Sequence, residues 1–321
     1  MTRPNVALVG AGSMGTNHAR VIAGSDRADL AWVVDPRREA GEPLAERFGA
    51  RWAPDLESTV GTHAVVIAAA TEWHHQLATD ALERGLPLLV EKPMCPSLED
   101  TEEIIRLSER VGAPLMCGFL ERYNPAFLVA RGMLSEPRYV RAERHSPYAP
   151  RIKTGVAWDL LVHDVDLIAQ LFGGADPDSL AVEVGQYHPL SSPGAEDVIE
   201  TSLRFADGGI ASASASRISQ QKVRKLVIHE LDRTIEVDML RRGVTAYRHT
   251  RVQSDEEGST YRQATEIEIP EVIGKEPLIT QFDRFVDLIE GTIDADEERA
   301  SALPAHRIVE RALVASRATT V

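Results

Sequence analysis

Short apolar stretches alternate with helix-like patterns over the first 120 residues of the chain. The stretches are nearly continuous in apolar character, which is typical of strands buried on both faces of a parallel sheet. Residues 72–84 and the segment beginning at Ser97 follow the helical pattern, and Ser97 with Asp100 predicts an N-terminal cap for the second helix. This alternation predicts a doubly wound parallel sheet of the Rossmann type. The strands are expected at 5–10, 28–35, 63–69, 86–91 and 114–119.

Beyond residue 119 the pattern changes to shorter strand-like stretches joined by short connections, such as 207–209 and 231–233. Short connections favour antiparallel pairing. We therefore predict a second domain, of the α+β class, built on an open and mostly antiparallel sheet. A helix that begins at Pro125 precedes this sheet, and two helices close the chain. The strands are expected near 138–144, 180–187, 197–205, 209–217, 223–230, 233–240, 244–249 and 265–269, and the closing helices at 277–290 and 304–317.

The predicted boundary between the two domains lies at residue 120, so that the first spans 1–120 and the second 121–321. The pattern leaves open whether the last helix packs back on the first domain. A chain of 321 residues is long enough for two domains of ordinary size, each with its own core.

Composition narrows the class of protein. Hydrophobic residues make up 43% of the chain and charged residues 26%, and no apolar run approaches the roughly 18 residues of a membrane span. No secretory leader precedes the first strand, so we expect a cytoplasmic protein without a membrane partner. The net charge of −14 disfavours a nucleic-acid partner, because phosphate binding needs a basic surface. Cys95 and Cys117 are too few for a disulfide framework, and Cys95 is expected to be a bystander thiol.

A glycine-rich turn follows the first predicted strand. Gly10, Gly12 and Gly15 have the GxGxxG spacing, with Ser13 and Met14 at the start of the predicted helix. Glycines permit a tight turn and let backbone N–H groups approach a pyrophosphate at the positive end of that helix. Strand, turn and helix in this order predict a dinucleotide site.

Asp35 ends the next predicted strand, 20 residues after Gly15, where an acid accepts hydrogen bonds from ribose hydroxyls. A carboxylate repels a 2′-phosphate, so Asp35 favours NAD as the cofactor. Arg37 and Arg38 follow closely, and an arginine at this place can pair with that phosphate, which keeps NADP open as the alternative.

Polar residues follow two of the predicted strands of the first domain, at the edge where a doubly wound sheet binds its ligands. Ala69, Ala70 and His74 follow one strand, and we expect them to contact the cofactor together with Glu91 and Lys92 at the end of the next. A lysine at this edge can hydrogen-bond a substrate hydroxyl or change the pKa of a neighbouring group. Pro93 restricts the backbone of the preceding residue, Lys92.

A polar stripe, Asp159, His163 and Asp166, interrupts the apolar stretch 156–174. At 3.6 residues per turn these positions lie on one helix face, whereas apolar residues cover most of the rest. The stripe is therefore expected to face a cleft, where a histidine oriented by an acid has the right pKa range to take the proton of an alcohol during hydride transfer. A histidine held by two carboxylates for stability is the alternative.

The stretches "VALVGAGSMGTNHA", "EKP" and "WDLLVHDVDL" resemble those of the Gfo/Idh/MocA family, named after glucose-fructose oxidoreductase, inositol dehydrogenase and rhizopine catabolism. The likeness runs through nearly the whole chain. It implies an NAD(P)-dependent oxidoreductase whose second domain binds substrate and forms a homodimer or homotetramer. It also implies that Lys92 and His163 are the catalytic pair and that Asp159 binds substrate or tunes the histidine. Two departures are Ala69-Ala70, where Thr-Pro is common, and Leu161, where a glycine is frequent.

The substrate class implied by the resemblance is a sugar, a polyol or a sugar nucleotide. The stretch "GFLERYNPA" is similar to a segment of some sugar-nucleotide 3-dehydrogenases of the family, which makes Arg122, Tyr123 and Asn124 candidate substrate contacts. Asn124 alternatively caps the helix that follows it. Further polar residues that could line the substrate site are Arg144, His145, Tyr148 and Arg151.

Three other functions stay open. Some relatives cleave glycosides with a tightly held NAD, by transient oxidation at C3. Others are dinucleotide-binding regulators without catalysis, although Lys92 and His163 count against this reading. Asp159, His163 and Asp166 could also bind a divalent metal ion, but with no second histidine cluster nearby no metal is expected.

Overall fold

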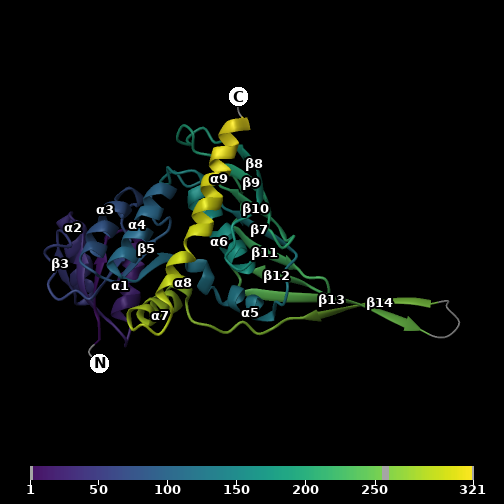
Figure 1. Ribbon diagram of the computed structural model, residues 1–321, viewed down its shortest axis with the longest axis horizontal. Helices are drawn as coiled ribbons and strands as arrows, with labels where there is room; N and C mark the ends of the chain where they lie inside the picture. Colours follow the sequence, from purple (N-terminus) through teal and green to yellow (C-terminus); the bar gives the residue numbers. More distant parts are fainter. Residues whose placement is uncertain (1–2, 255–259, 320–321) are drawn as a thin grey trace. The chain divides into compact units, whose positions relative to one another are not determined.

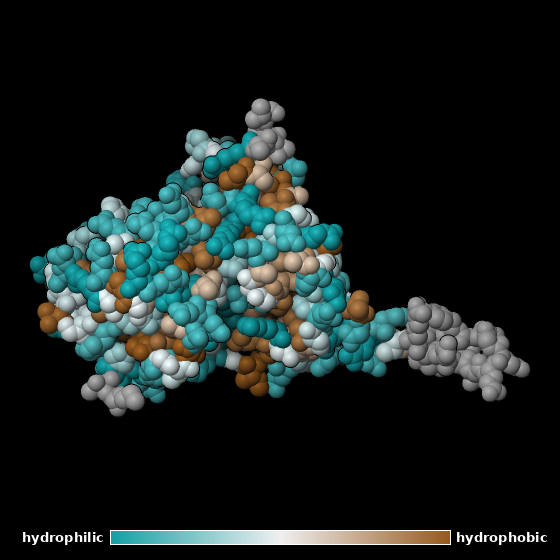
Figure 2. All heavy atoms as spheres, viewed as in Figure 1, coloured by the Kyte–Doolittle hydropathy of each residue, from teal (hydrophilic) through white to brown (hydrophobic). Residues whose placement is uncertain are grey.

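The computed structural model describes residues 3–254 and 260–319. The chain forms two compact units, the first from Met1–Leu120 and Glu276–His306, the second from Glu121–Lys275 and Arg307–Val321 (Figure 1). Hydrophilic residues predominate on the face drawn in Figure 2, and hydrophobic ones are scattered among them. Among the residues that the structure describes, no helix combines the length and the apolar character needed to cross a bilayer.

The first unit contains a six-stranded, wholly parallel sheet in the order β3-β2-β1-β4-β5-β6. The strand order reverses between β1 and β4, which is the switch point where such sheets bind nucleotides. The core strands are buried throughout, as their continuous apolar character requires. The strands are β1 Asn5–Val9, β2 Asp29–Val34, β3 Arg51–Ala53, β4 Ala64–Ile67, β5 Leu88–Glu91 and β6 Leu115–Gly118.

Helices follow β1, β2, β4 and β5, and Ser97 caps α4 by accepting a hydrogen bond from the N–H of Asp100. α3 contacts α4, and α1 contacts both α2 and α7. The helices are α1 Ser13–Ala23, α2 Arg38–Phe48, α3 His74–Glu83 and α4 Leu98–Val111, with a short 3₁₀ turn at Thr71–Trp73.

The first unit also includes residues 276–306, which the sequence pattern had assigned to the second domain. α7 (Pro277–Ile289) buries Phe282 and Phe285, and it is tied to the loop after α1 by ion pairs from Arg27 to Asp287 at 2.8 Å and to Glu290 at 2.7 Å. α8 (Ala295–Ala300) and the first turn of α9 (Leu303–Thr319) belong to the same unit. No spacing rule links these segments to the rest of the first unit, because the hydrogen bonds that join them to it connect residues 191 to 263 positions apart.

The second unit is built on an eight-stranded sheet in the order β14-β13-β12-β11-β7-β10-β9-β8, antiparallel except for the β7–β10 pair. Alternate residues are buried, so one face of the sheet carries the core. The strands are β7 Tyr139–His145, β8 Ser179–Gly185, β9 Val198–Arg204, β10 Ile210–Ser216, β11 Val223–His229, β12 Thr234–Asp238, β13 Gly243–Ser254 and β14 Thr260–Glu268.

Helices of the second unit pack on this sheet: α6 (Val162–Leu171) contacts β7 and β10, and α5 (Pro125–Met133) contacts β12 and β13 (Figure 1). A π-helical turn, Ala157–Leu161, leads directly into α6, and a 3₁₀ turn, Leu120–Tyr123, precedes α5. A π-helical turn holds more residues than an α-helical one, so the residues before α6 depart from the 3.6-residue period.

A buried guanidinium lies between β7 and α6. Arg144 is 2% exposed and donates to both carboxylate oxygens of Asp164, at 2.8 and 3.0 Å, and to Glu121 at 2.9 Å. Burial alone would lower the pKa of the Arg144 guanidinium, but the neighbouring carboxylates of Asp164 and Glu121 hold this pKa above its ordinary value. Arg144, a candidate for the substrate site by sequence, is thus a core residue that joins β7, α6 and the turn before α5.

Replacing Arg144 with methionine should lower the free energy of unfolding by about 3–5 kcal/mol, because Asp164 would stay buried without its partner and Glu121 would keep only the ion pair with Arg224. Arg141→Met is the control: Arg141 is three residues earlier on β7, half exposed, and pairs with Glu143 at 3.4 Å. Its effect should stay below about 0.5 kcal/mol. Urea denaturation followed by circular dichroism measures both, and equal midpoints would show that the buried cluster does not stabilise the unit.

Candidate active site

The glycine turn joins β1 to α1 by backbone contacts that leave no room for side chains at two of its three glycines. The N–H of Gly10 donates to the carbonyl of Val34 at 2.8 Å, and Gly10 has a φ of +100°. A Cβ on Gly10 would lie 2.7 Å from the backbone of Ala68, and a Cβ on Gly15 would lie 1.9 Å from the carbonyl oxygen of Gly10. These two glycines are therefore required by packing.

Gly12 differs from the other two, because a Cβ placed there meets no protein atom within 4 Å. Gly12 is also the N-cap of α1, where no side chain caps the helix and no acidic residue lies in the first turn. Gly12 and Ser13 are exposed. The N–H groups at this helix end are thus accessible to a phosphate, which is what a dinucleotide needs at this turn.

Asp35 follows β2 beside the glycine turn. It is 3% exposed and accepts hydrogen bonds from the N–H of Ala11 at 2.9 Å and from the backbone and side chain of Arg37. Burial alone would raise the pKa of the Asp35 carboxyl, but the hydrogen bonds from Arg37 and Ala11 outweigh burial and hold this pKa below its usual range. The carboxylate is therefore ionised at neutral pH and can accept bonds from a ribose.

Arg37 extends along Asp35, with its Nε 3.1 Å from the carboxylate, although most of the side chain is exposed. Arg38 pairs with Glu42 at 2.7 Å, and its guanidinium lies over the ring of Trp52. Both arginines considered for a 2′-phosphate thus have partners within the first unit.

Lys92 follows β5 at the carboxyl edge of the sheet and is half buried. The preceding Glu91 is 8% exposed, and its carboxylate lies 2.7 Å from Nε2 of His18 on α1. The sequence predicted a cofactor contact for Glu91 but gave no sign of its partner His18, because no local spacing connects residues 73 positions apart.

His74, also predicted to contact the cofactor, is 1% exposed. Its Nδ1 lies 2.9 Å from the carbonyl oxygen of Pro93, and its Nε2 lies 3.1 Å from that of Ala69. The ring therefore joins the segment after β4 to the segment after β5. His74 supports the two loops at the rim from within the core.

The polar stripe predicted on residues 156–174 is divided in the structure. Asp159 and His163 are half buried, whereas Asp166 is 1% exposed and held by Arg122 through two bonds of 2.8 and 2.5 Å. Asp166 thus forms a buried ion pair within the second unit. Asp159 lies in the π-helical turn and His163 in the first turn of α6.

The three candidate substrate contacts at 122–124 are also bonded or buried inside the second unit. Arg122 holds Asp166, and Tyr123 is 7% exposed. Asn124 caps α5 by accepting from the N–H of Ala126 at 3.1 Å and donates to the carbonyl of Met239 at 3.2 Å. The structure thus gives Asn124 the capping role that the sequence analysis offered as the alternative.

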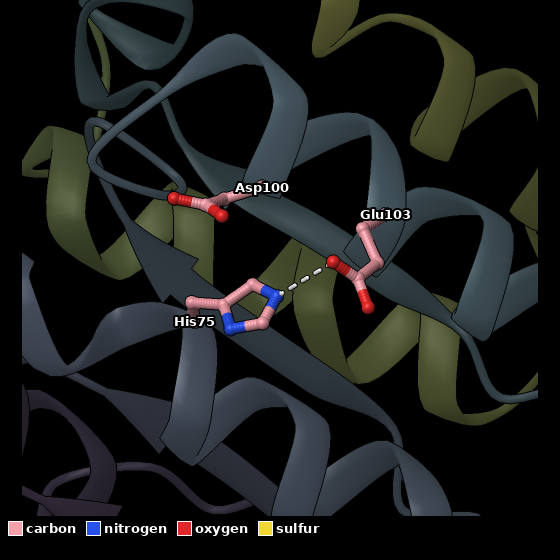
Figure 3. Close-up of side chains that lie close together, drawn as sticks. All are labelled: His75, Asp100 and Glu103. Atoms are coloured by element: carbon pink, nitrogen blue, oxygen red, sulfur yellow. Dashed lines mark hydrogen bonds and ion pairs between the residues drawn. The ribbon is translucent and has the colours of Figure 1, made fainter.

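A group of side chains that could bind a metal ion lies in the first unit and does not include the polar stripe. Within 3–254 and 260–319, His75, Asp100 and Glu103 place one possible ligand atom each within 4.8 Å of one another. Figure 3 shows the ring of His75 directed toward Glu103, with Asp100 beside them, and the His75–Glu103 distance is 3.3 Å. All three are partly or fully exposed, so an ion pair accounts for them. Asp166 is engaged by Arg122, which removes it as a ligand beside His163.

Comparison with known families decides the class of protein. Residues 4–119 match the model described as "Oxidoreductase family, NAD-binding Rossmann fold", and residues 127–237 match the "GFO/IDH/MocA C-terminal domain". The chain belongs to the Gfo/Idh/MocA oxidoreductase family. The predicted family, the parallel and antiparallel sheets, the oxidoreductase class and NAD as cofactor are thereby confirmed.

Members of the Gfo/Idh/MocA family with known activities are similar over most of the chain. UDP-N-acetylglucosamine 3-dehydrogenase of Acidithiobacillus ferrooxidans is 28% identical over 250 residues, which is 77% of this chain and 78% of that protein. The NAD(+)-dependent scyllo-inositol 2-dehydrogenase of Bacillus subtilis is 29% identical over 233 residues, 66% of this chain and 67% of that protein.

A solved structure of the A. ferrooxidans enzyme superposes with a TM-score of 0.88 at 24% identity and covers 99% of both chains. Levoglucosan dehydrogenase in complex with NADH and levoglucosan gives 0.82 at 18% identity, covering 99% of this chain and 98% of that one. These likenesses show that the Gfo/Idh/MocA fold extends over nearly the whole chain.

Gly12→Ala should weaken NAD binding by about tenfold or more, because the methyl group enters the space that the pyrophosphate needs. The thermal midpoint should change little, since the φ of −76° suits alanine and no protein atom is displaced. Gly15→Ala is the matched control and should lower the midpoint strongly, because its Cβ meets the carbonyl of Gly10. Isothermal titration and thermal melts separate the two effects, and unchanged NAD affinity in Gly12→Ala would place the pyrophosphate elsewhere.

Cys95 should resist alkylation in the folded protein. The thiol is fully buried, and burial, with a further contribution from the charge of Asp100, raises its pKa to about 12. Iodoacetamide at pH 8 followed by peptide mapping should leave Cys95 unmodified until denaturant is added. Rapid labelling without denaturant would contradict the bystander role.

Proposed function

We propose that the protein oxidises a secondary alcohol of a sugar, polyol or sugar nucleotide with NAD, or reduces the corresponding ketone. The single observation that carries the proposal is the arrangement at one sheet edge of the first unit. Gly10 packs against Ala68, and His74 joins Ala69 to Pro93, so the glycine turn and Lys92 belong to one connected edge. The named relatives act on a nucleotide sugar and on an inositol, which supports the substrate class.

The residues of the first unit fit NAD at this edge. The exposed N–H groups at Gly12 and Ser13 would hold the pyrophosphate, and the ionised Asp35 would accept bonds from the adenosine ribose. Met14, Ala69 and Ala70 lie on the same turn and strand end and would line the dinucleotide. When bound, NAD supplies the hydride acceptor for the alcohol carbon.

The catalytic roles follow from what hydride transfer requires. As the hydride leaves carbon, the hydroxyl proton must leave oxygen, and we assign its acceptance to His163. The ammonium of Lys92 would donate to the same oxygen and stabilise the charge that develops there. Asp159, half buried one turn before His163, would orient the imidazole or hold a neighbouring hydroxyl. One C–H and one O–H bond break, and the products are a ketone, reduced nicotinamide and a protonated histidine.

Arg122, Tyr123 and Asn124 stay candidate substrate contacts. Arg122 and Asn124 are engaged in internal bonds, so the likeness of "GFLERYNPA" to nucleotide-sugar enzymes does not by itself favour a nucleotide-linked substrate. Free polyols, free sugars and nucleotide sugars therefore belong in one substrate panel. We expect the enzyme to work in the cytoplasm as a homodimer or homotetramer.

Absorbance of reduced nicotinamide tests the proposal directly. Purified protein with NAD or NADP and each member of the panel should show reduction of NAD with one substrate class. Bound dinucleotide without net reduction, but with glycoside cleavage, would support the closed oxidation cycle known in some relatives. Bound dinucleotide with neither activity would support a regulator.

Lys92→Ala and His163→Ala should each lower kcat by about a hundredfold or more, because each removes a group that acts in the transition state. The affinity for NAD should survive both changes. Lys222→Ala, at an exposed lysine before β11, serves as control and should keep kcat. Steady-state kinetics and NAD titration measure the two quantities. Wild-type turnover in either active-site variant would remove that residue from the mechanism.

A further inference from the structure

One peptide unit in the first unit of the chain is bonded at both of its polar groups by buried histidines. The carbonyl oxygen of Pro93 lies 2.9 Å from Nδ1 of His74, and the N–H of Met94 donates to Nε2 of His306 at 3.0 Å. These two atoms belong to the same peptide bond, which comes directly after Lys92-Pro93. His74 is 1% exposed and His306 is fully buried.

The groups around each ring indicate which ring nitrogen donates a hydrogen bond and which accepts one. Nδ1 of His306 lies 2.7 Å from the carbonyl oxygen of Ala302, so this nitrogen carries the hydrogen and Nε2 is free to accept from Met94. His74 faces carbonyl oxygens at both nitrogens, and a carbonyl oxygen only accepts, so Nδ1 can bond Pro93 only as a donor. One histidine thus donates to the peptide while the other accepts from it.

The two rings come from helices far apart in the sequence, His74 from the first turn of α3 and His306 from the first turn of α9. The ring of Phe119 packs against His306 with centroids 5.6 Å apart. Met94 is fully buried as well. The peptide therefore cannot rotate without breaking two hydrogen bonds in a place that water does not reach.

We propose that His74 and His306 form a clamp on the Pro93–Met94 peptide and thereby fix the position of the Lys92 backbone. Both are positioning residues, because they act through Lys92 and not on the substrate. The clamp rests on the proposed function in one respect, namely that Lys92 acts in turnover. A catalytic ammonium must be held closely, since small displacements of a reacting group cost large factors in rate.

Substitutions at His306 test the clamp. His306→Phe keeps a ring against Phe119 but removes the acceptor for Met94, and it should lower kcat by about tenfold or more with little change in the KM for NAD. His306→Gln offers an amide oxygen in place of Nε2 and should recover part of kcat. His74→Phe should behave as His306→Phe does. A kcat that falls equally in His306→Phe and His306→Gln, or in neither, would overturn the proposal.

Ser108→Ala is the control for lost stability. Ser108 is a fully buried residue of the same unit whose hydroxyl donates to Ala113 and accepts from Arg299, so its loss should also lower the thermal midpoint. The variant should keep kcat, because its bonds do not touch the segment after Lys92. If kcat follows the thermal midpoint across all variants, the histidines are only structural and the clamp is refuted.

Amide hydrogen exchange of Met94 tests the clamp without turnover. In the protein without NAD, this amide should be protected in the wild type and should exchange about tenfold or more faster in His306→Phe, whereas amides of β1 should keep their protection. An unprotected Met94 amide in the wild type would refute the clamp. Normal turnover in Lys92→Ala with intact protection would instead refute the proposed role of Lys92 and leave the clamp standing.

Discussion

The close approach of α1 to the glycine turn is the constraint on which the first unit depends. The carbonyl of Gly10 lies where a side chain on residue 15 would begin, so the helix can start only at this distance from β1. Gly10 in turn packs on Ala68 and bonds to Val34, which fixes the ends of β4 and β2 against the turn. These backbone contacts place the accessible N–H groups and the Asp35 carboxylate, and the ring of His74 connects the end of β4 to the loop that carries Lys92.

Buried polar groups are satisfied in two ways. Near Lys92, the rings of His74 and His306 bond to the backbone. In the second unit, buried charges pair: Arg144 with Asp164, and Arg122 with Asp166. Such pairs add little net stability over an apolar core, but an unpaired member would be costly. They therefore hold α6 in one rotation, which buries two of its acids and leaves Asp159 and His163 half exposed.

Much of the first unit could be predicted because its signals are local. The strands, the glycine turn, Asp35 and the place of Lys92 after β5 follow from patterns within a few residues. The assignments at Arg122, Asn124 and Asp166 depended on side-chain partners, and these are chosen by tertiary packing between residues up to 115 positions apart. The single-face stripe on 156–174 assumed a constant period, which the π-helical turn interrupts. The placement of 276–306 in the first unit comes from the packing of α7 on α1 and of α8 on β6 and α4, which no periodicity reveals.

The hydrogen-bond partners of Asp35 also bear on the choice between NAD and NADP. A 2′-phosphate would bring a second anion beside a carboxylate whose hydrogen bonds keep it ionised, and Arg37 already serves that carboxylate with its side chain. Binding the phosphate would require Arg37 to leave Asp35, which would uncover a buried charge while adding repulsion. Arg38 pairs with Glu42 and lies over Trp52, so it would also have to give up these contacts to bind the phosphate. A ribose with a free 2′-hydroxyl instead donates to Asp35 and leaves both pairs intact, so the geometry of the β2 terminus favours NAD over NADP.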